Sequence, residues 1–257
     1  MGNAGKPTPK AFRFRDKAIE EYNNPDLNPH LRAHIEHGLP VLTAAQAAGH
    51  RGKWREHFER DAPLHVEIGS GNGFFLAGRA TQSPEFNWLG LEIRFKRVMQ
   101  AAVKIERAEV VQHTRIARYN AFQLSDLFSP GEIDCLYINH PDPWPKRKHD
   151  LNRLLSANFF EGLAPLMRDG AELRLKTDHV LNMKAARTNA LDGPLAKDWE
   201  LVGESENVND GGPPWDLDIV TNYQRKFVER NEPVYALWLR RVAPRSLDTE
   251  TPSDMKK

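Results

Sequence analysis

A short acidic and glycine-rich segment, Glu67-Ile-Gly-Ser-Gly-Asn-Gly73, combines residue types and spacing that could bind a ligand. Its three glycines allow a tight turn and a close approach of the backbone to that ligand. The spacing differs from the G-x-G-x-x-G of dinucleotide folds, and no lysine follows where a phosphate-binding loop requires one. Glu67 comes just before Gly69 and Gly71 and favours a cationic ligand. S-adenosylmethionine (SAM), with an ammonium and a sulfonium group, fits this segment.

Two more polar residues end apolar segments further along the chain. Glu92 lies twenty-five residues after Glu67, where a carboxylate can accept hydrogen bonds from both ribose hydroxyls of an adenosine. Alone it would equally suit a solvated strand end, but its pairing with the glycine turn favours the ligand interpretation. Asn120 suits the adenine edge or the N-cap of a helix, and the two roles are compatible.

The most distinctive segment runs from Asn139 to His149, NHPDPWPKRKH. Three prolines in five residues stiffen it, so Asp142 and Trp144 are expected to hold fixed positions. The basic residues that follow are Lys146, Arg147, Lys148 and Arg153. A rigid acid beside a basic cluster suits a substrate with a base to orient and phosphates to hold. The alternative is a stiff surface loop.

The candidates fall at the ends of segments that alternate between strand and helix patterns. Strands are expected over 64–69, 86–93, 111–119, 133–139, 171–176, 200–206 and 235–242. Helices are expected from Phe74, over 94–107, over 154–167 with a stop at Asp169-Gly170, and over 179–191. This alternation predicts an α/β fold with a mostly parallel sheet and helices on both faces. Such sheets bind ligands beyond the carboxyl ends of their strands.

Composition narrows the class of protein. The chain has 257 residues, 40% of them hydrophobic and 28% charged, with a net charge of +1. It has no apolar run of about 18 residues and no secretory signal pattern, so we expect no membrane span. The single cysteine, Cys135, excludes an internal disulfide framework and a multi-cysteine zinc site, and favours a cytoplasmic setting. His140, His149 and His179 lack a convincing ligand set, so no metal is expected.

The chain is expected to divide into three parts. Residues 1–60 form a basic, polar N-terminal extension, of which residues 1–18 are either a solvated tail or an arm that contacts a phosphate backbone. Residues 61–244 form the catalytic domain, and residues 245–257 a flexible tail. The sequence leaves open whether the protein is a monomer or a homodimer.

The motifs EIGSGNG, GLEI, PDPWPKRKH, KTDH and TNYQRKF occur in this order between residues 63 and 242. In order and spacing they resemble the bacterial-type tRNA (guanine-N7-)-methyltransferase family. The resemblance implies a class I SAM-dependent methyltransferase fold, which is Rossmann-like, with seven strands of which one is antiparallel. It also implies methyl transfer from SAM to N7 of a guanosine in the tRNA variable loop.

The resemblance also assigns roles residue by residue. Asp142 matches the family's catalytic acid. The residues that match cofactor contacts are Glu67, Gly69, Gly71, Glu92, Asn120 and Asp142. Those that match substrate contacts are Lys146, Asp178, Thr221, Asn222, Tyr223 and Gln224. Taken alone, the segments around Asp178 and Thr221 would be ordinary turns.

Two positions depart from the family pattern. Asn120 stands where an aspartate is usual, and Gln224 stands where a glutamate is usual. A carboxylate accepts from both N1–H and the 2-amino group of guanine, whereas a glutamine offers one acceptor and a mismatched donor. Guanine selectivity is therefore expected to rest more on Asp178.

Three alternatives stay open from the sequence. The first is a methyltransferase of the same fold that acts on a different RNA or a small molecule, which Gln224 permits. The second is an RNA-binding protein without catalysis, which the intact Glu67, Glu92 and Asp142 disfavour. The third is a nicotinamide-dependent dehydrogenase, which the glycine spacing disfavours.

Overall fold

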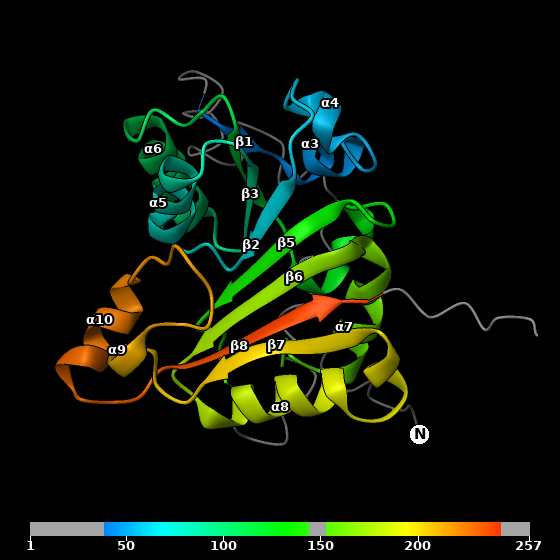
Figure 1. The fold of residues 1–257 in the computed structure, drawn as a ribbon. Coiled ribbons are helices and arrows are strands. Elements are labelled where there is room, and N and C mark those ends of the chain that lie inside the picture. Colours follow the sequence, from blue (N-terminus) through cyan, green and yellow to red (C-terminus); the bar gives the residue numbers. More distant parts are fainter. Residues whose placement is uncertain (1–38, 144–152, 243–257) are drawn as a thin grey trace, which may run out of the picture.

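The computed structural model describes residues 39–143 and 153–242, which form one mixed sheet with helices on both faces (Figure 1). The strands are β1 (Val41–Leu42), β2 (Leu64–Ile68), β3 (Asn87–Glu92), β4 (Thr114–Arg118), β5 (Ile133–Asn139), β6 (Met167–Thr177), β7 (Trp199–Ser205) and β8 (Tyr235–Arg241). Their order is β1-β4-β3-β2-β5-β6-β8-β7. All neighbours are parallel except that β8 runs antiparallel to β6 and β7. The predicted mostly parallel sheet with one antiparallel strand is confirmed.

Within the described residues the sheet has eight strands where seven were expected, because β1 adds an edge strand. Val41 and Leu42 pair with Ile116 and Ala117 of β4. β1 lies within the expected polar extension, and so does Trp54, which is fully buried and donates its indole N–H to the Leu127 carbonyl. Residues 39–60 therefore pack on the sheet, while the boundary at residue 61 stays a prediction. Residues 1–38 and 243–257 lie outside the described part of the chain.

Helices cover both faces of the sheet because successive strand residues point to opposite sides. They are α3 (Ala44–Gly49), α4 (Trp54–His57), α5 (Phe74–Gln82), α6 (Phe95–Arg107), α7 (Ala157–Leu163), α8 (Val180–Leu191), α9 (Val208–Gly211) and α10 (Asn222–Glu229). On β5, Leu136 and Ile138 pack in a core with α3, α4, α7 and α8. Cys135 and Tyr137 of the same strand pack with α5 and α6. Within the described residues no helix is long and apolar enough to cross a membrane.

The predicted helix over 154–167 is shorter than expected. α7 begins after Ser156, whose hydroxyl caps it by accepting from the Phe159 N–H. It ends at Leu163, followed by a short 3-10 turn over Ala164–Leu166. Pro165 has no N–H to donate to the preceding turn, which explains the early end. The helix stop expected at Asp169-Gly170 is wrong, because both residues lie in β6 where its pairing with β5 shifts register.

The carboxyl ends of β2, β3, β5 and β6 meet at one edge of the sheet, because these strands are parallel neighbours. α9 and α10 lie beyond the ends of β5 and β6 at the same edge (Figure 1). The candidate residues named from the sequence follow these strands. The fold therefore gathers them at one edge although they are spread over more than 150 residues, from Glu67 to Gln224.

Candidate active site

The glycine turn after β2 is held by backbone bonds to β3. The N–H groups of Gly69 and Ser70 donate to the Leu91 carbonyl, at 2.8 and 3.1 Å. Gly73 has φ 76° and precedes α5, and a Cβ on it would lie 2.6 Å from the Cα of Ala101 in α6. A side chain there would push the two helices apart. The turn therefore needs glycine for its packing as well as for its conformation.

Glu67 lies at the end of β2 and is almost completely buried, with 2% of its surface exposed. Its Oε1 accepts a hydrogen bond from Asn139 Nδ2 at 3.1 Å, whereas its buried Oε2 has no partner among the described residues. Burial raises the pKa of Glu67 to about 7, against the lowering effect of Asn139, Ser70 and Lys176. An unpaired buried carboxylate oxygen is costly, so it indicates a missing donor. A cationic group is the donor that best suits it.

Glu92 closes the turn from the β3 side. Its carboxylate accepts from the Gly71 N–H at 3.0 Å and from the Arg94 N–H at 2.8 Å. A carboxylate has about four acceptor positions, so two remain for a ligand. Asn120 caps the turn after β4 by accepting from the Phe122 N–H at 3.1 Å, which confirms the capping role. Its contact to an adenine edge stays a prediction.

Asp142 is exposed just beyond β5, in a segment held by the neighbouring strand and helix. His140 turns the chain with a positive φ of 49°, and its N–H donates to the Lys176 carbonyl at 2.8 Å. The Pro141 carbonyl accepts from Asn182 Nδ2 of α8 at 2.8 Å. These bonds fix the backbone on which Asp142 sits. Trp144, Lys146, Arg147 and Lys148 lie outside the described residues.

Asp178, at the end of β6, is paired with the segment that carries Asp142. Its Oδ1 lies 3.1 Å from Nδ1 of His140, whose side chain is 4% exposed. Partial burial alone would raise the pKa of Asp178, but the hydrogen bond from His140, a backbone hydrogen bond and the charges of His140 and His179 together outweigh it, and the pKa is lowered. The His140 ring also stacks on Tyr223 and Phe227 of α10, with centroids 6.0 and 5.7 Å apart. The predicted residues Asp178 and Tyr223 are thus brought to the Asp142 segment.

The side chains of Thr221 and Gln224 are occupied within the protein. Thr221 Oγ1 accepts from the Gln224 N–H at 3.0 Å and caps α10. Gln224 is 3% exposed, and its Oε1 accepts from Lys176 Nζ at 3.1 Å. Asn222 and Tyr223 are exposed at the start of α10, and Tyr223 shows 61% of its surface. In this segment the exposed ring is therefore the group best placed to contact a substrate.

Comparisons with known proteins show the family of this chain. The profile of a family described as "Putative methyltransferase" matches residues 61–237. A tRNA (guanine-N(7)-)-methyltransferase of Bacillus subtilis is 31% identical over 194 residues, covering 76% of this chain and 88% of the relative. A protein of that name from Streptococcus thermophilus is 30% identical and covers 80% and 91%. The chain belongs to the tRNA (guanine-N7-)-methyltransferase family.

Solved structures support the fold. The 16S rRNA methyltransferase KamB superposes with a TM-score of 0.53 at 14% identity, over 75% of this chain and 94% of that one. The 16S rRNA (adenine(1408)-N(1))-methyltransferase from Catenulisporales acidiphilia gives 0.52 at 18% identity, over 75% and 93%. These likenesses show that the chain has the class I SAM-dependent methyltransferase fold.

SAM is the cofactor of this family, and the residues present fit it. The unpaired Oε2 of Glu67 offers an acceptor to a cationic group beside a turn whose glycines leave room for a ligand. Glu92 keeps acceptor capacity at the end of the next strand. Among the described residues, no three His, Cys, Asp or Glu side chains gather in a way that could hold a metal ion.

Sequence reasoning missed the residue that organises the substrate side, Lys176. Its Nζ is buried at the end of β6 and donates to both carboxylate oxygens of Asp218, at 2.9 and 2.8 Å. It also donates to the Ile219 carbonyl at 2.8 Å, in addition to Gln224. Burial lowers the pKa of Lys176, and the charge of Asp218 opposes this. The one available signal was a lysine at the end of a buried strand, which needs a carboxylate partner somewhere.

Proposed function

We propose that the protein transfers a methyl group from SAM to N7 of a guanosine in the variable loop of tRNA. One observation carries the proposal. Glu67, a buried carboxylate with one oxygen that has no partner in the described part of the chain, shares the sheet edge with two further acids, Asp142 and Asp178. The two relatives compared above carry the name of this activity and support the choice of acceptor.

The cofactor would be held by the β2 and β3 ends of the edge. SAM supplies a methyl group activated by a positively charged sulfur. Glu67 would accept hydrogen bonds from the cofactor's ammonium group, and Glu92 from the ribose hydroxyls. Gly69 and Gly71 would let the backbone approach closely, and Asn120 would contact the adenine edge. Asp142 would border both cofactor and guanine.

Methylation at guanine N7 requires the protein to position the guanine and to stabilise the developing charge, and little more. Guanine N7 carries an in-plane lone pair and no proton, so no general base is needed to expose the nucleophile. Positive charge develops on the purine as the bond to N7 forms, and the carboxylate of Asp142 would stabilise it. Catalysis therefore rests on alignment and electrostatics. Asp142 need not accept a proton.

The guanosine would be bound from the β6 and α10 side. The lowered pKa of Asp178 keeps its carboxylate ionised, which suits acceptance from the N–H groups of guanine. Tyr223 offers an exposed ring on which a base can stack, and Lys146 would hold a phosphate. Exposing a guanosine from the tRNA core costs a few kcal/mol of stacking and pairing, which such contacts offset.

The test is methyl transfer from labelled SAM to bulk tRNA, followed by nucleoside analysis of the product. N7-methylguanosine is the expected product. A different methylated nucleoside, or binding of SAM without transfer to tRNA, would instead support an acceptor other than guanosine N7.

A further inference from the structure

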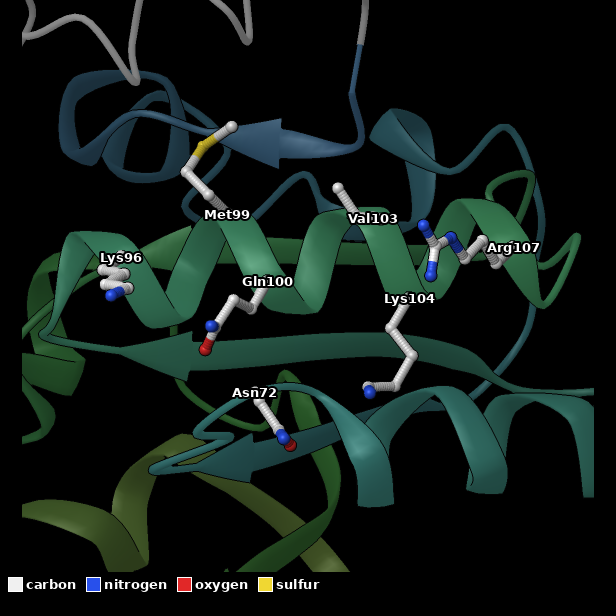
Figure 2. Close-up of a pocket in the computed structure, with 7 residues that line it drawn as sticks. All are labelled: Asn72, Lys96, Met99, Gln100, Val103, Lys104 and Arg107. Carbon is white, nitrogen blue, oxygen red and sulfur yellow. The ribbon is translucent and has the colours of Figure 1, made fainter.

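A row of basic side chains lines a hollow on the outer side of α6, next to the glycine turn (Figure 2). The hollow has a volume of about 460 Å³ and is bordered by Asn72 of the turn and by residues of α6. We call it the α6 groove and define it by the residues that line it, which are Asn72, Lys96, Met99, Gln100, Val103, Lys104 and Arg107. None of the predicted cofactor or substrate contacts lines it. Its composition therefore needs an explanation of its own.

The spacing of the three cations places them on one stripe of the helix. Lys96, Lys104 and Arg107 differ by eight and three positions, so all three fall within about 80° around the helix axis. Along the axis they span about 17 Å. One strand of a nucleic-acid duplex presents roughly five phosphates over that length. The stripe matches a linear polyanion better than a small anion.

The three cations are not neutralised within the described part of the chain. No ion pair joins Lys96, Lys104 or Arg107 to a carboxylate there, and no acid borders the hollow. By contrast, Lys176 and Arg174 are paired with carboxylates at 2.8 and 2.7 Å. Unpaired like charges that line a hollow raise the local positive potential and attract anions.

The cations of α6 are linked to the substrate side of the candidate active site through Phe74. Phe74 begins α5, and the Nζ of Lys104 lies 6.0 Å from its ring centroid. The guanidinium of Arg225, in α10, lies 5.3 Å from the same centroid. Arg225 is exposed and lies two residues after Tyr223, the ring proposed to meet the base. Positive charge therefore extends from α6 across Phe74 to α10.

We infer that the α6 groove holds the phosphate backbone of the tRNA that presents its guanosine to the active site. The inference rests on the proposed function for the identity of the RNA. The α6 groove, on the β2–β3 side of the site, would be a second docking surface beside the basic segment 146–148 predicted from the sequence. Lys96, Lys104 and Arg107 would each neutralise backbone charge and carry no base specificity.

The test compares two double variants of the full chain. Lys96→Gln/Lys104→Gln removes two charges from the α6 groove. Lys53→Gln/Lys197→Gln is the matched control, because both lysines are exposed and come shortly before β2 and β7, at the opposite edge of the sheet. The dissociation constant for tRNA is measured across a salt series for both variants and the wild type. Thermal unfolding and the Kd for SAM check that each variant is folded.

Each phosphate contact contributes about 0.7 to 0.9 to the slope of log affinity against log salt. The α6 variant should therefore lower the slope by about 1.4 to 1.8, while the control keeps the wild-type slope. Equal slopes for all three proteins would overturn the inference and make the stripe a solvated face. Methylation of tRNA by the wild type is scored separately. A changed slope without any methylation would keep the docking surface and reject the proposed function.

Discussion

The buried ammonium of Lys176 allows a quantitative test of how residues 218–224, which include predicted substrate contacts, are held in place. Lys176→Met keeps most of the side-chain length but removes the hydrogen bonds to Asp218, the Ile219 carbonyl and Gln224. The two charged side chains are 1% and 13% exposed, so the change leaves the carboxylate of Asp218 largely buried without its counter-ion. Removing one partner of a buried pair costs about 3–5 kcal/mol. For a domain of this size that is a fall in Tm of roughly 6–20 °C.

The assay is urea and thermal unfolding of the variant beside two others. Lys176→Met/Asp218→Asn leaves no unpaired charge, so it should recover more than half of the lost stability. Lys184→Met, at an exposed position of α8, should stay within about 0.5 kcal/mol of the wild type. A loss below about 1 kcal/mol for Lys176→Met, or a double variant no more stable than Lys176→Met, would refute the reasoning. Where Lys176→Met folds, the KM for tRNA should rise more than the Kd for SAM.

Three further predictions concern acids of the site. Because burial raises the pKa of Glu67 to about 7 from 4.5, its protonation favours the folded state and about 3 kcal/mol of stability is lost between these pH values as pH rises. Denaturation at pH 5 and pH 8 should show this change as the difference between the wild type and Glu67→Gln, because buried histidines with lowered pKa values, such as His57 and His65, titrate over the same range in both proteins. His140→Phe keeps an aromatic ring but removes the hydrogen bond to Asp178, so the pKa of Asp178 should rise and the KM for tRNA should increase. His140→Asn can donate a hydrogen bond again and should bring the KM part of the way back. An unchanged KM in His140→Phe would show that His140 does not position Asp178. Asp142→Asn should lower kcat by about 10²–10³ with tRNA binding kept, and near-full turnover would show that the acid is not catalytic.

The sheet was predictable because each of its longer strands carries its own signal. Apolar segments such as 64–69 and 133–139 are followed by turn residues and then by helical periodicity. β1 was not predictable, because two residues, Val41 and Leu42, are too few to show alternation. The end of α7 was misjudged because Asp169-Gly170 is also an ordinary turn signal, and only the pairing of β6 shows that it lies in a strand.

Some residues of the site could be placed from the local sequence, and others only from the fold. Glu67, the glycines and Glu92 lie directly at strand ends, so their position follows from the chain itself. The Lys176 contacts join residues 42 to 48 positions apart, and the pair of His140 and Asp178 spans 38. No local sequence pattern predicts such pairs. They form because the fold places the ends of β5 and β6 beside α10.

The burial of Gln224 changes the role that we assign to this residue. From the sequence it is a guanine contact weakened by the loss of a carboxylate. In the structure its side-chain oxygen accepts from Lys176, and 3% of its surface is exposed. A neutral amide suits this place, because Lys176 already has a counter-ion in Asp218. We therefore expect the guanine to contact Asp178 on this side, where the Asp178 side chain is 28% exposed.

The most direct measurement of the central claim is methyl transfer to a tRNA transcript in which 7-deazaguanosine replaces guanosine. This change removes the N7 lone pair and keeps the Watson–Crick edge that Asp178 would contact. Labelled SAM should methylate the guanosine transcript and leave the 7-deaza transcript unlabelled, although the protein binds both. Equal labelling of the two transcripts would contradict methyl transfer to guanine N7.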